Sequence, residues 1–277
     1  MRDIVRYINS AGQEQFFNKG NCLCNTKALR EFLYTVQNKR LYSNQPKTVV
    51  LETVFHGSPG ERDAIINLLE YDSIQNTYGR LYVNEWYLLC RFVGIQSITK
   101  EGLQNIRMDL QFVADTIEWS RESSYSLTPV EYPQTDYQVN DYPTDYPHDY
   151  GINSEQMARI VNNELSPADI RVRMKLTSDI ISAEQVSFAI SNSDNSSHTY
   201  SVNLTGFTVA IGNEFVLDTQ AKTVEILTEN SSFSIFGGTV DDYYIFEKIS
   251  AGTSVVESDY SMTVDVIEHR RLPKWKI

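Results

Sequence analysis

The sequence contains few cysteines and no long apolar run. Cys22 and Cys24 are separated only by Leu23, and Cys90 lies alone. Because no secretion signal is present, we expect all three to remain thiols. Residues 1–7 lack the apolar core of a signal peptide, which predicts synthesis in the cytoplasm without export. No run of about 18 apolar residues occurs, so no helix is predicted to span a membrane.

Basic residues are also scarce. The chain has 24 Lys and Arg against 36 Asp and Glu, which gives a formal net charge of −12 at pH 7. A surface that binds nucleic acid needs clustered Lys and Arg, so we expect no nucleic-acid recognition. No Lys or Arg occurs between Arg121 and Arg159, and the middle of the chain therefore carries much of the acidic excess.

Signatures of catalytic and metal sites are missing. The four histidines form no H-E-x-x-H motif, and G-x-S-x-G, phosphate-loop and G-x-G-x-x-G motifs are absent. Cys22 and Cys24 have no partnering Cys or His pair at zinc-ligand spacing. Ser58 follows a histidine and a glycine, but Pro59 and Glu61 after it indicate a helix cap rather than a nucleophile. We predict no catalytic residues, no metal or cofactor site and no enzyme activity. A glycan hydrolase stays open as an alternative, because the sequence singles out no pair among its acidic residues.

One stretch is unusually rich in tyrosine, proline and aspartate. Residues 131–151 read EYPQTDYQVNDYPTDYPHDYG. Proline excludes a helix or a central strand here, and a Pro-rich chain tends to be a semi-rigid spacer. Because disordered segments are poor in aromatic residues, we predict a linker strap over residues 131–152 that packs on protein surface, with an exposed disordered linker as the alternative. The aspartates could bind Ca²⁺, but the EF-hand ligand pattern is missing. The tyrosines expected to pack are Tyr132, Tyr137, Tyr142, Tyr146 and Tyr150.

The segment before the strap, residues 1–130, is predicted to be a β-rich domain with one helix. A capping serine, Ser58, precedes Pro59 and an apolar stripe, which predicts a helix from there. Residues 105–114 alternate apolar and polar side chains, as in a half-buried antiparallel strand. Further strands are predicted at residues 48–56 and on both sides of a turn at Asn84 and Glu85.

The segment after the strap, residues 153–277, is predicted to be a β-sandwich. Short strands separated by turn residues recur along it, which is typical of sandwiches and jelly rolls. The predicted strands cover residues 170–176, 186–190, 200–204, 214–217, 223–227 and 260–266. One of them presents a basic stripe of Arg171, Arg173 and Lys175. Such a row is usually a solvated strand face, and the alternative is an interaction surface for an acidic neighbour, such as the strap of another copy.

Several segments, taken in order, resemble one protein family. Residues 141–151 (DYPTDYPHDYG) resemble the linker of phage distal tail proteins, and residues 79–90 (GRLYVNEWYLLC) resemble the N-terminal domain of that family. Residues 166–170 (SPADI), the turn at Asp218, residues 245–253 (IFEKISAGT) and residues 268–275 (EHRRLPKW) resemble its C-terminal half. No single motif is diagnostic, but the order of the motifs is specific and runs through nearly the whole chain.

The resemblance implies a mainly β, two-domain structural protein of the tail tip of a siphophage that infects Gram-positive hosts. Its N-terminal ring (belt) domain would form a homo-hexameric ring, and its C-terminal domain would be a galectin-like β-sandwich. The ring would join the major tail tube protein to the tail-associated fibre or lysin protein, or to the baseplate, and anchor receptor-binding proteins. The resemblance also favours a strand over a helix in residues 29–36. The family offers no catalytic residues to assign.

A carbohydrate-binding protein that attaches to host cell-wall glycans is the alternative. Sugar binding by a β-sandwich favours exposed aromatic side chains, and the only tryptophan after the strap is Trp275. The tyrosines of this half would have to serve as stacking platforms. Galectin-like sugar-binding signatures are absent, and fold similarity alone does not establish lectin activity.

Overall fold

The computed structural model describes residues 3–30, 35–37, 40–42, 47–101, 105–114, 116, 118–128, 157–239 and 244–275. These residues form mainly antiparallel β-structure, which confirms the predicted fold class. The chain forms two compact units, one of Met1–Arg121 with His269–Ile277 and the other of Glu122–Glu268. It passes from unit 1 to unit 2 within strand β10 (Trp119–Leu127) and returns within strand β19 (Met262–Arg270).

Unit 1 is built around strand β8 (Trp86–Glu101), which pairs with β7 (Gly79–Val83) through its first half and with β9 (Asn105–Ala114) through its second half. The path β8-β7-β1-β2 forms one arm of strands and the path β8-β9-β6-β3 forms the other. The predicted turn at Asn84 and Glu85 joins β7 to β8, and Asn84 has a positive φ of 57°. The remaining elements are β1 (Val5–Ile8), β2 (Glu14–Phe16), β3 (Cys22–Cys24), α1 (Lys27–Arg30), β4 (Thr35–Gln37), β5 (Arg40–Tyr42) and β6 (Lys47–His56).

The core of unit 1 is aromatic. Phe112 of β9 is surrounded by the rings of Tyr7, Phe17 and Phe92, with ring centroids 5.4, 6.3 and 5.7 Å away. The alternation predicted for residues 105–114 is confirmed, because Met108, Leu110, Phe112 and Ala114 are buried. Edge-to-face and tilted aromatic packing of this kind adds to the stabilisation that burial alone provides.

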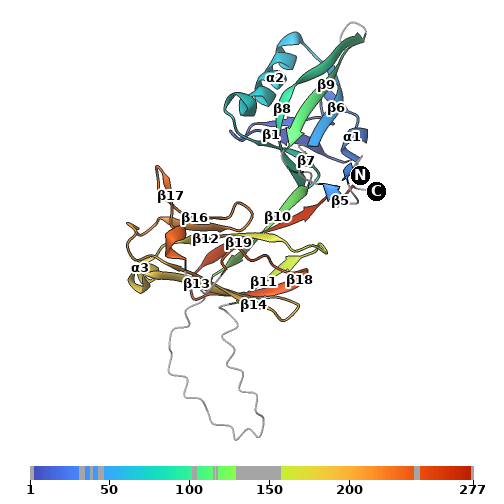
Figure 1. Cartoon of the computed structure of the whole chain (residues 1–277). Helices are drawn as coiled ribbons and strands as arrows, with labels where there is room; N and C mark the ends of the chain where they lie inside the picture. The colour runs from blue at the N-terminus through green and yellow to red at the C-terminus, as the bar shows by residue number, and fades with distance from the viewer. Residues whose placement is uncertain are drawn as a thin grey trace, which may run out of the picture. The chain divides into compact units, whose positions relative to one another are not determined.

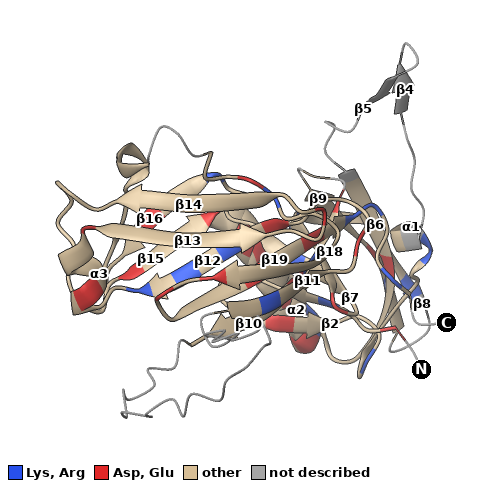
Figure 2. Ribbon diagram, turned by 90° about the horizontal axis from the view of Figure 1, so that it is seen from below, with Lys and Arg blue, Asp and Glu red and all other residues tan. Residues whose placement is uncertain are grey.

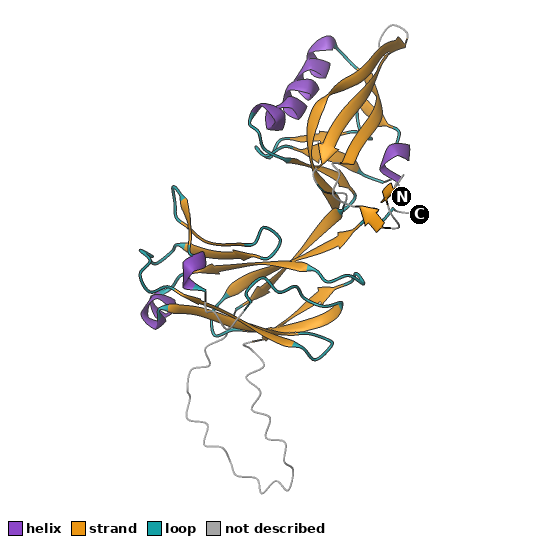
Figure 3. Ribbon diagram, in the orientation of Figure 1, coloured by secondary structure: helices purple, strands orange, loops and turns teal. Residues whose placement is uncertain are grey.

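Helix α2 (Pro59–Ile74) forms where its capping signals predict. The Ser58 side chain accepts a hydrogen bond from the Glu61 N–H, and the Ser58 N–H donates to the Glu61 carboxylate, so both halves of the capping box are present. Figure 3 shows the helix lying against the strands of unit 1. The helix buries Leu69 and Asp72 against them, and this fixes the position of its last turn.

Unit 2 is a β-sandwich with one continuous core. One sheet has the order β17-β16-β15-β12-β19-β10 and the other the order β11-β18-β13-β14 (Figure 1). Phe188 of β13 and Tyr200 of β14 stack in the core with ring centroids 4.6 Å apart. The elements are β11 (Met157–Asn162), β12 (Asp169–Lys175), α3 (Ser178–Ala183), β13 (Gln185–Ser191), β14 (Ser197–Asn203), β15 (Glu214–Asp218), β16 (Thr223–Leu227), β17 (Ser232–Ser234), a 3-10 turn (Phe236–Gly238) and β18 (Gly252–Glu257).

Other sequence-based expectations fall wholly or partly outside the described residues. The strap with Tyr132, Tyr137, Tyr142, Tyr146 and Tyr150 lies outside them, so its packing and the domain boundaries at 130 and 153 stay predictions. Of the strand expected over residues 29–36, the described part is helical up to Arg30 and extended from Thr35. The strand prediction was therefore wrong at its start.

The state of the cysteines and the length of the helices can also be read from the structure. The three cysteines are free, and burial raises the pKa of the Cys22 and Cys24 thiols to about 12. Among the described residues, no helix combines the length and the apolar character needed to cross a bilayer.

Candidate functional site

The basic stripe on β12 is matched by acidic side chains of its own chain. The Arg171 Nε lies 2.7 Å from Asp218 Oδ2, and Arg173 Nη2 lies 2.8 Å from Asp265 Oδ2. These carboxylates come from the strands on either side of β12 and are almost fully buried, with side-chain exposures of 9% and 4%. The basic residues of β12 and their acidic neighbours are coloured in Figure 2. Lys175, at the exposed end of the strand, lies opposite Glu214. Much of the positive charge is therefore balanced locally, and a role for the stripe in contacts between molecules stays a prediction.

An apolar hollow in unit 1 is the first of two candidate surfaces. It has a volume of about 570 Å³ and lies between the end of α2 and the middle of β8. Ile74, the last residue of α2, is 74% exposed, and Val93 of β8 is 54% exposed. Both side chains line this hollow. Large apolar side chains gathered on one surface usually mark a contact with another molecule.

A β-bulge explains why Val93 is exposed. In the β8–β9 ladder Phe92 pairs with Phe112 and Gly94 pairs with Gln111, which leaves Val93 without a partner. The extra residue lets Phe92 pack in the core while Val93 faces outward, as bulges redirect side chains. Gly94 has a φ of 147°, a conformation that few residues other than glycine adopt.

Charged side chains frame the same hollow. Glu70 of α2 and Arg91 of β8 line it. The Arg91 guanidinium lies 4.0 Å from the centroid of the Tyr78 ring and donates a 2.6 Å hydrogen bond to Asn76. An apolar centre with a polar rim is the usual composition of a protein–protein contact.

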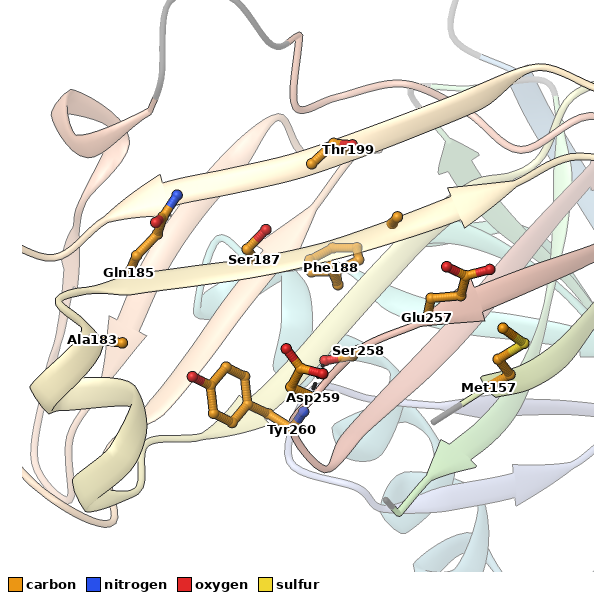
Figure 4. A pocket seen from close by; sticks show the side chains of 11 residues that line it. Met157, Ala183, Gln185, Ser187, Phe188, Thr199, Glu257, Ser258, Asp259 and Tyr260 are labelled. Atoms are coloured by element: carbon orange, nitrogen blue, oxygen red, sulfur yellow. Dashed lines mark hydrogen bonds between the residues drawn. The ribbon is translucent and has the colours of Figure 1, made fainter. Parts of the chain in front are cut away.

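A polar groove in unit 2 is the second candidate surface (Figure 4). It has a volume of about 370 Å³ and lies over β13, with contributions from β14, β18 and the turn after β18. Gln185, Ser187 and Ala189 point outward from β13, while the residues between them are buried. Glu257, Asp259 and Tyr260 come from the end of β18 and the turn that follows.

The groove carries acidic and neutral polar groups. None of the described residues that line it is Lys or Arg. Glu257 and Asp259 belong to one short segment, whereas glycoside hydrolysis needs two carboxylates that flank the scissile bond. No group of three or more metal-ligating side chains occurs among the described residues.

Sequence reasoning did not single out either surface. The only local signal for the hollow is Gly94 inside an apolar strand, since an isolated strand glycine often marks a bulge. The groove depends on β13 and on β18 with the turn that follows it, two segments that lie far apart in the sequence, and no local pattern reveals that they meet.

Comparisons with known proteins identify the fold. No family model matches the sequence, and no curated protein matches it. The fold is similar to chains in two structures of the phage p2 baseplate in its activated conformation, one with Sr and one with Ca. The TM-score is 0.58 for each, with 10% and 11% sequence identity, and the matches cover 98% and 99% of this chain and 99% and 100% of those chains.

A further match is the crystal structure of SPP1 Dit (gp 19.1), a hub adsorption protein of phages that infect Gram-positive bacteria. Its TM-score is 0.49 at 10% identity, with 98% of this chain and 100% of that chain covered. At such low identity the two matches to the p2 baseplate establish a shared fold. The predicted resemblance to phage tail proteins is thus confirmed at the level of the fold.

Proposed function

We propose that this protein is a structural component of a phage tail tip, a distal tail protein that forms a hexameric ring. The ring would join the tail tube to the fibre or baseplate and to receptor-binding proteins. The supporting observation is the likeness to a phage p2 baseplate chain over 98–99% of this chain at a TM-score of 0.58. A likeness that covers both units accounts for the whole molecule rather than for one common module.

In this proposal unit 1 forms the ring, and unit 2, a galectin-like sandwich, carries outward-facing contacts. A closed ring needs a heterologous contact, in which one face of each copy meets a different face of the next. The hollow with Ile74 and Val93 supplies a suitable apolar patch on unit 1. Leaving such side chains in water is unfavourable, and covering them with a second copy would recover about 25 cal/mol for each Å² buried.

A charge placed in the hollow should prevent ring formation. Val93→Asp puts a carboxylate where the proposal expects a desolvated apolar contact, and an unpaired buried charge is costly. Because Val93 is exposed in the single chain, the variant should fold normally. The measurement is the native mass of the full-length protein, alone and mixed with its tail tube protein, for wild type and variant.

The matched control is Ile211→Asp, at an exposed apolar residue of unit 2 (71% exposed) that does not line the hollow. Wild type and the control should form hexamers, while Val93→Asp should remain monomeric. A wild-type protein that stays monomeric at high concentration and with the tube protein would count against the ring. Hexamers of Val93→Asp would show that the contact lies elsewhere.

A further inference from the structure

The polar groove of unit 2 shares no lining residue with the hollow assigned to the proposed ring contact, and its chemistry suits a ligand of its own. We propose that this groove binds an uncharged oligosaccharide. Tyr260 provides the surface on which a sugar ring stacks, and Gln185, Glu257 and Asp259 hydrogen-bond to its hydroxyl groups. The site lies within unit 2 and does not depend on ring formation.

The outer face of β13 and β14 is built from small polar side chains. Along β13, Val186, Phe188 and Ile190 are buried, so Ser187 and Ala189 lie on the opposite face. Ala189 pairs with Thr199 of β14. Short side chains leave the space above the sheet open, and Figure 4 shows longer side chains, those of Gln185, Glu257 and Tyr260, around this open area.

The hydrogen-bonding groups suit a hydroxyl-rich ligand. Gln185 donates through Nε2 to the Ser201 hydroxyl, which leaves its carbonyl oxygen to accept a hydrogen bond from a ligand. Glu257 and Asp259 form no ion pair with another described residue, so their oxygens are available to sugar hydroxyls. Each carboxylate accepts several hydrogen bonds, and bonds to charged groups are stronger than bonds between neutral ones.

The aromatic group and the size of the groove fit the same ligand. Tyr260 is half-buried against the sandwich core, so its ring is held in place. A fixed ring can receive the apolar face of a sugar without much further loss of side-chain freedom. The volume of about 370 Å³ lies within the range of about 300 to 1,000 Å³ that is usual for small-ligand sites.

Charge decides between sugar classes. With two carboxylates and no Lys or Arg among the described lining residues, the groove repels phosphate-bearing or carboxylate-bearing polymers. Of the described residues that line it, Met157 is the one large exposed apolar side chain, at 43% exposure. An apolar peptide would therefore find little to bury. A neutral oligosaccharide satisfies the polar groups without a charge conflict.

The test uses the full-length protein and isothermal titration with neutral hexose and N-acetylhexosamine oligosaccharides. Glycerol-phosphate polymer serves as the anionic probe. We expect saturable binding of at least one neutral oligosaccharide and none of the anionic polymer. Gln185→Ala and Asp259→Ala, both at exposed positions, should each weaken binding about tenfold, as expected when hydrogen bonds to a ligand are lost.

Matched controls are Gln220→Ala and Glu229→Ala, which change exposed residues away from the groove and should leave the affinity unchanged. The affinity of Tyr260→Ala is interpreted together with its unfolding curve, because Tyr260 also packs on the core and its loss can destabilise unit 2. The proposal is overturned if no neutral oligosaccharide binds, if the anionic polymer binds instead, or if Gln185→Ala and Asp259→Ala bind as well as wild type. Each of these results leaves the ring proposal untouched, because the native mass tests that proposal separately.

Discussion

At the scale of single residues, unit 1 depends on the buried carboxylate of Asp72. It accepts hydrogen bonds from the Tyr7 hydroxyl at 2.6 Å, the Ser10 N–H at 2.8 Å and the Thr77 hydroxyl at 3.1 Å. A Cβ atom on Gly79 would overlap both the Tyr7 hydroxyl and the Asp72 carboxylate. This network ties α2 to β1 and to the start of β7.

The pKa of Asp72 reflects this network. Burial alone would raise the pKa, but the hydrogen bonds from Ser10, Tyr7 and Thr77 outweigh burial and lower it. A carboxyl with a lowered folded-state pKa stabilises the protein above its unfolded pKa, and this contribution is lost as the pH falls through the folded value. The stabilisation from Asp72 is therefore complete at neutral pH and disappears in acid.

Asp72→Asn should destabilise unit 1 by about 2 kcal/mol at pH 7, because the amide satisfies fewer of the buried donors and removes the charge. The difference between wild type and variant should shrink as the pH falls below about 4, because the Asp72 carboxyl of the unfolded chain is protonated there while the folded chain, with its lowered pKa, still holds the charge. Urea unfolding followed by tryptophan fluorescence measures this well, because all three tryptophans, Trp86, Trp119 and Trp275, belong to unit 1. An equal difference at pH 7 and pH 3 would contradict the role given to the charge.

Residue partners of this kind could not be predicted from the sequence. The basic stripe was visible as an alternation, but Arg171 pairs with a residue 47 positions away and Arg173 with one 92 positions away. These partners follow from strand order and register, which no local pattern specifies. The alternating pattern therefore indicated the basic residues of β12 but not the buried carboxylates that pair with them.

At the scale of elements, a helix or strand could be predicted from the sequence where its signal lies in neighbouring residues. Helix α2 was predicted because a capping serine, a following proline and a glutamate lie next to each other at residues 58–61. Strand β9 was predicted because its alternation is regular. For residues 29–36 a strand was predicted, but the chain is helical up to Arg30. The apolar spacing of this segment fits a helix and a strand equally well, so the sequence could not decide between them.

Removing the cap of α2 should loosen its first turn. Ser58→Ala deletes the oxygen that accepts from the Glu61 N–H, and the loss of an N-cap costs about 1 kcal/mol. Amide hydrogens in the first turn should then exchange about fivefold faster, because local opening is easier by that amount. Hydrogen exchange read by mass spectrometry checks this, with Ser261→Ala, an exposed serine of unit 2, as the control. Unchanged exchange in the first turn would show that Pro59 and tertiary packing alone hold the start of the helix.

At the scale of the whole molecule, the sequence predicted a mainly β protein, and the fold confirms it. No local pattern predicted that the chain passes between the units inside two strands, so that the end of β19 and the residues after it belong to unit 1. Such a return can be recognised only from long-range pairing. The similarity in fold to the phage p2 baseplate chains covers 98–99% of this chain and therefore includes both units.

The most direct test of the tail-tip proposal is cryo-electron microscopy of the assembled phage particle with this protein located in the density. We expect six copies in a closed ring at the distal end of the tail, with unit 1 against the tube and unit 2 outside the ring. Absence of the protein from the particle, or its presence anywhere other than a ring at the tail tip, would contradict the proposal.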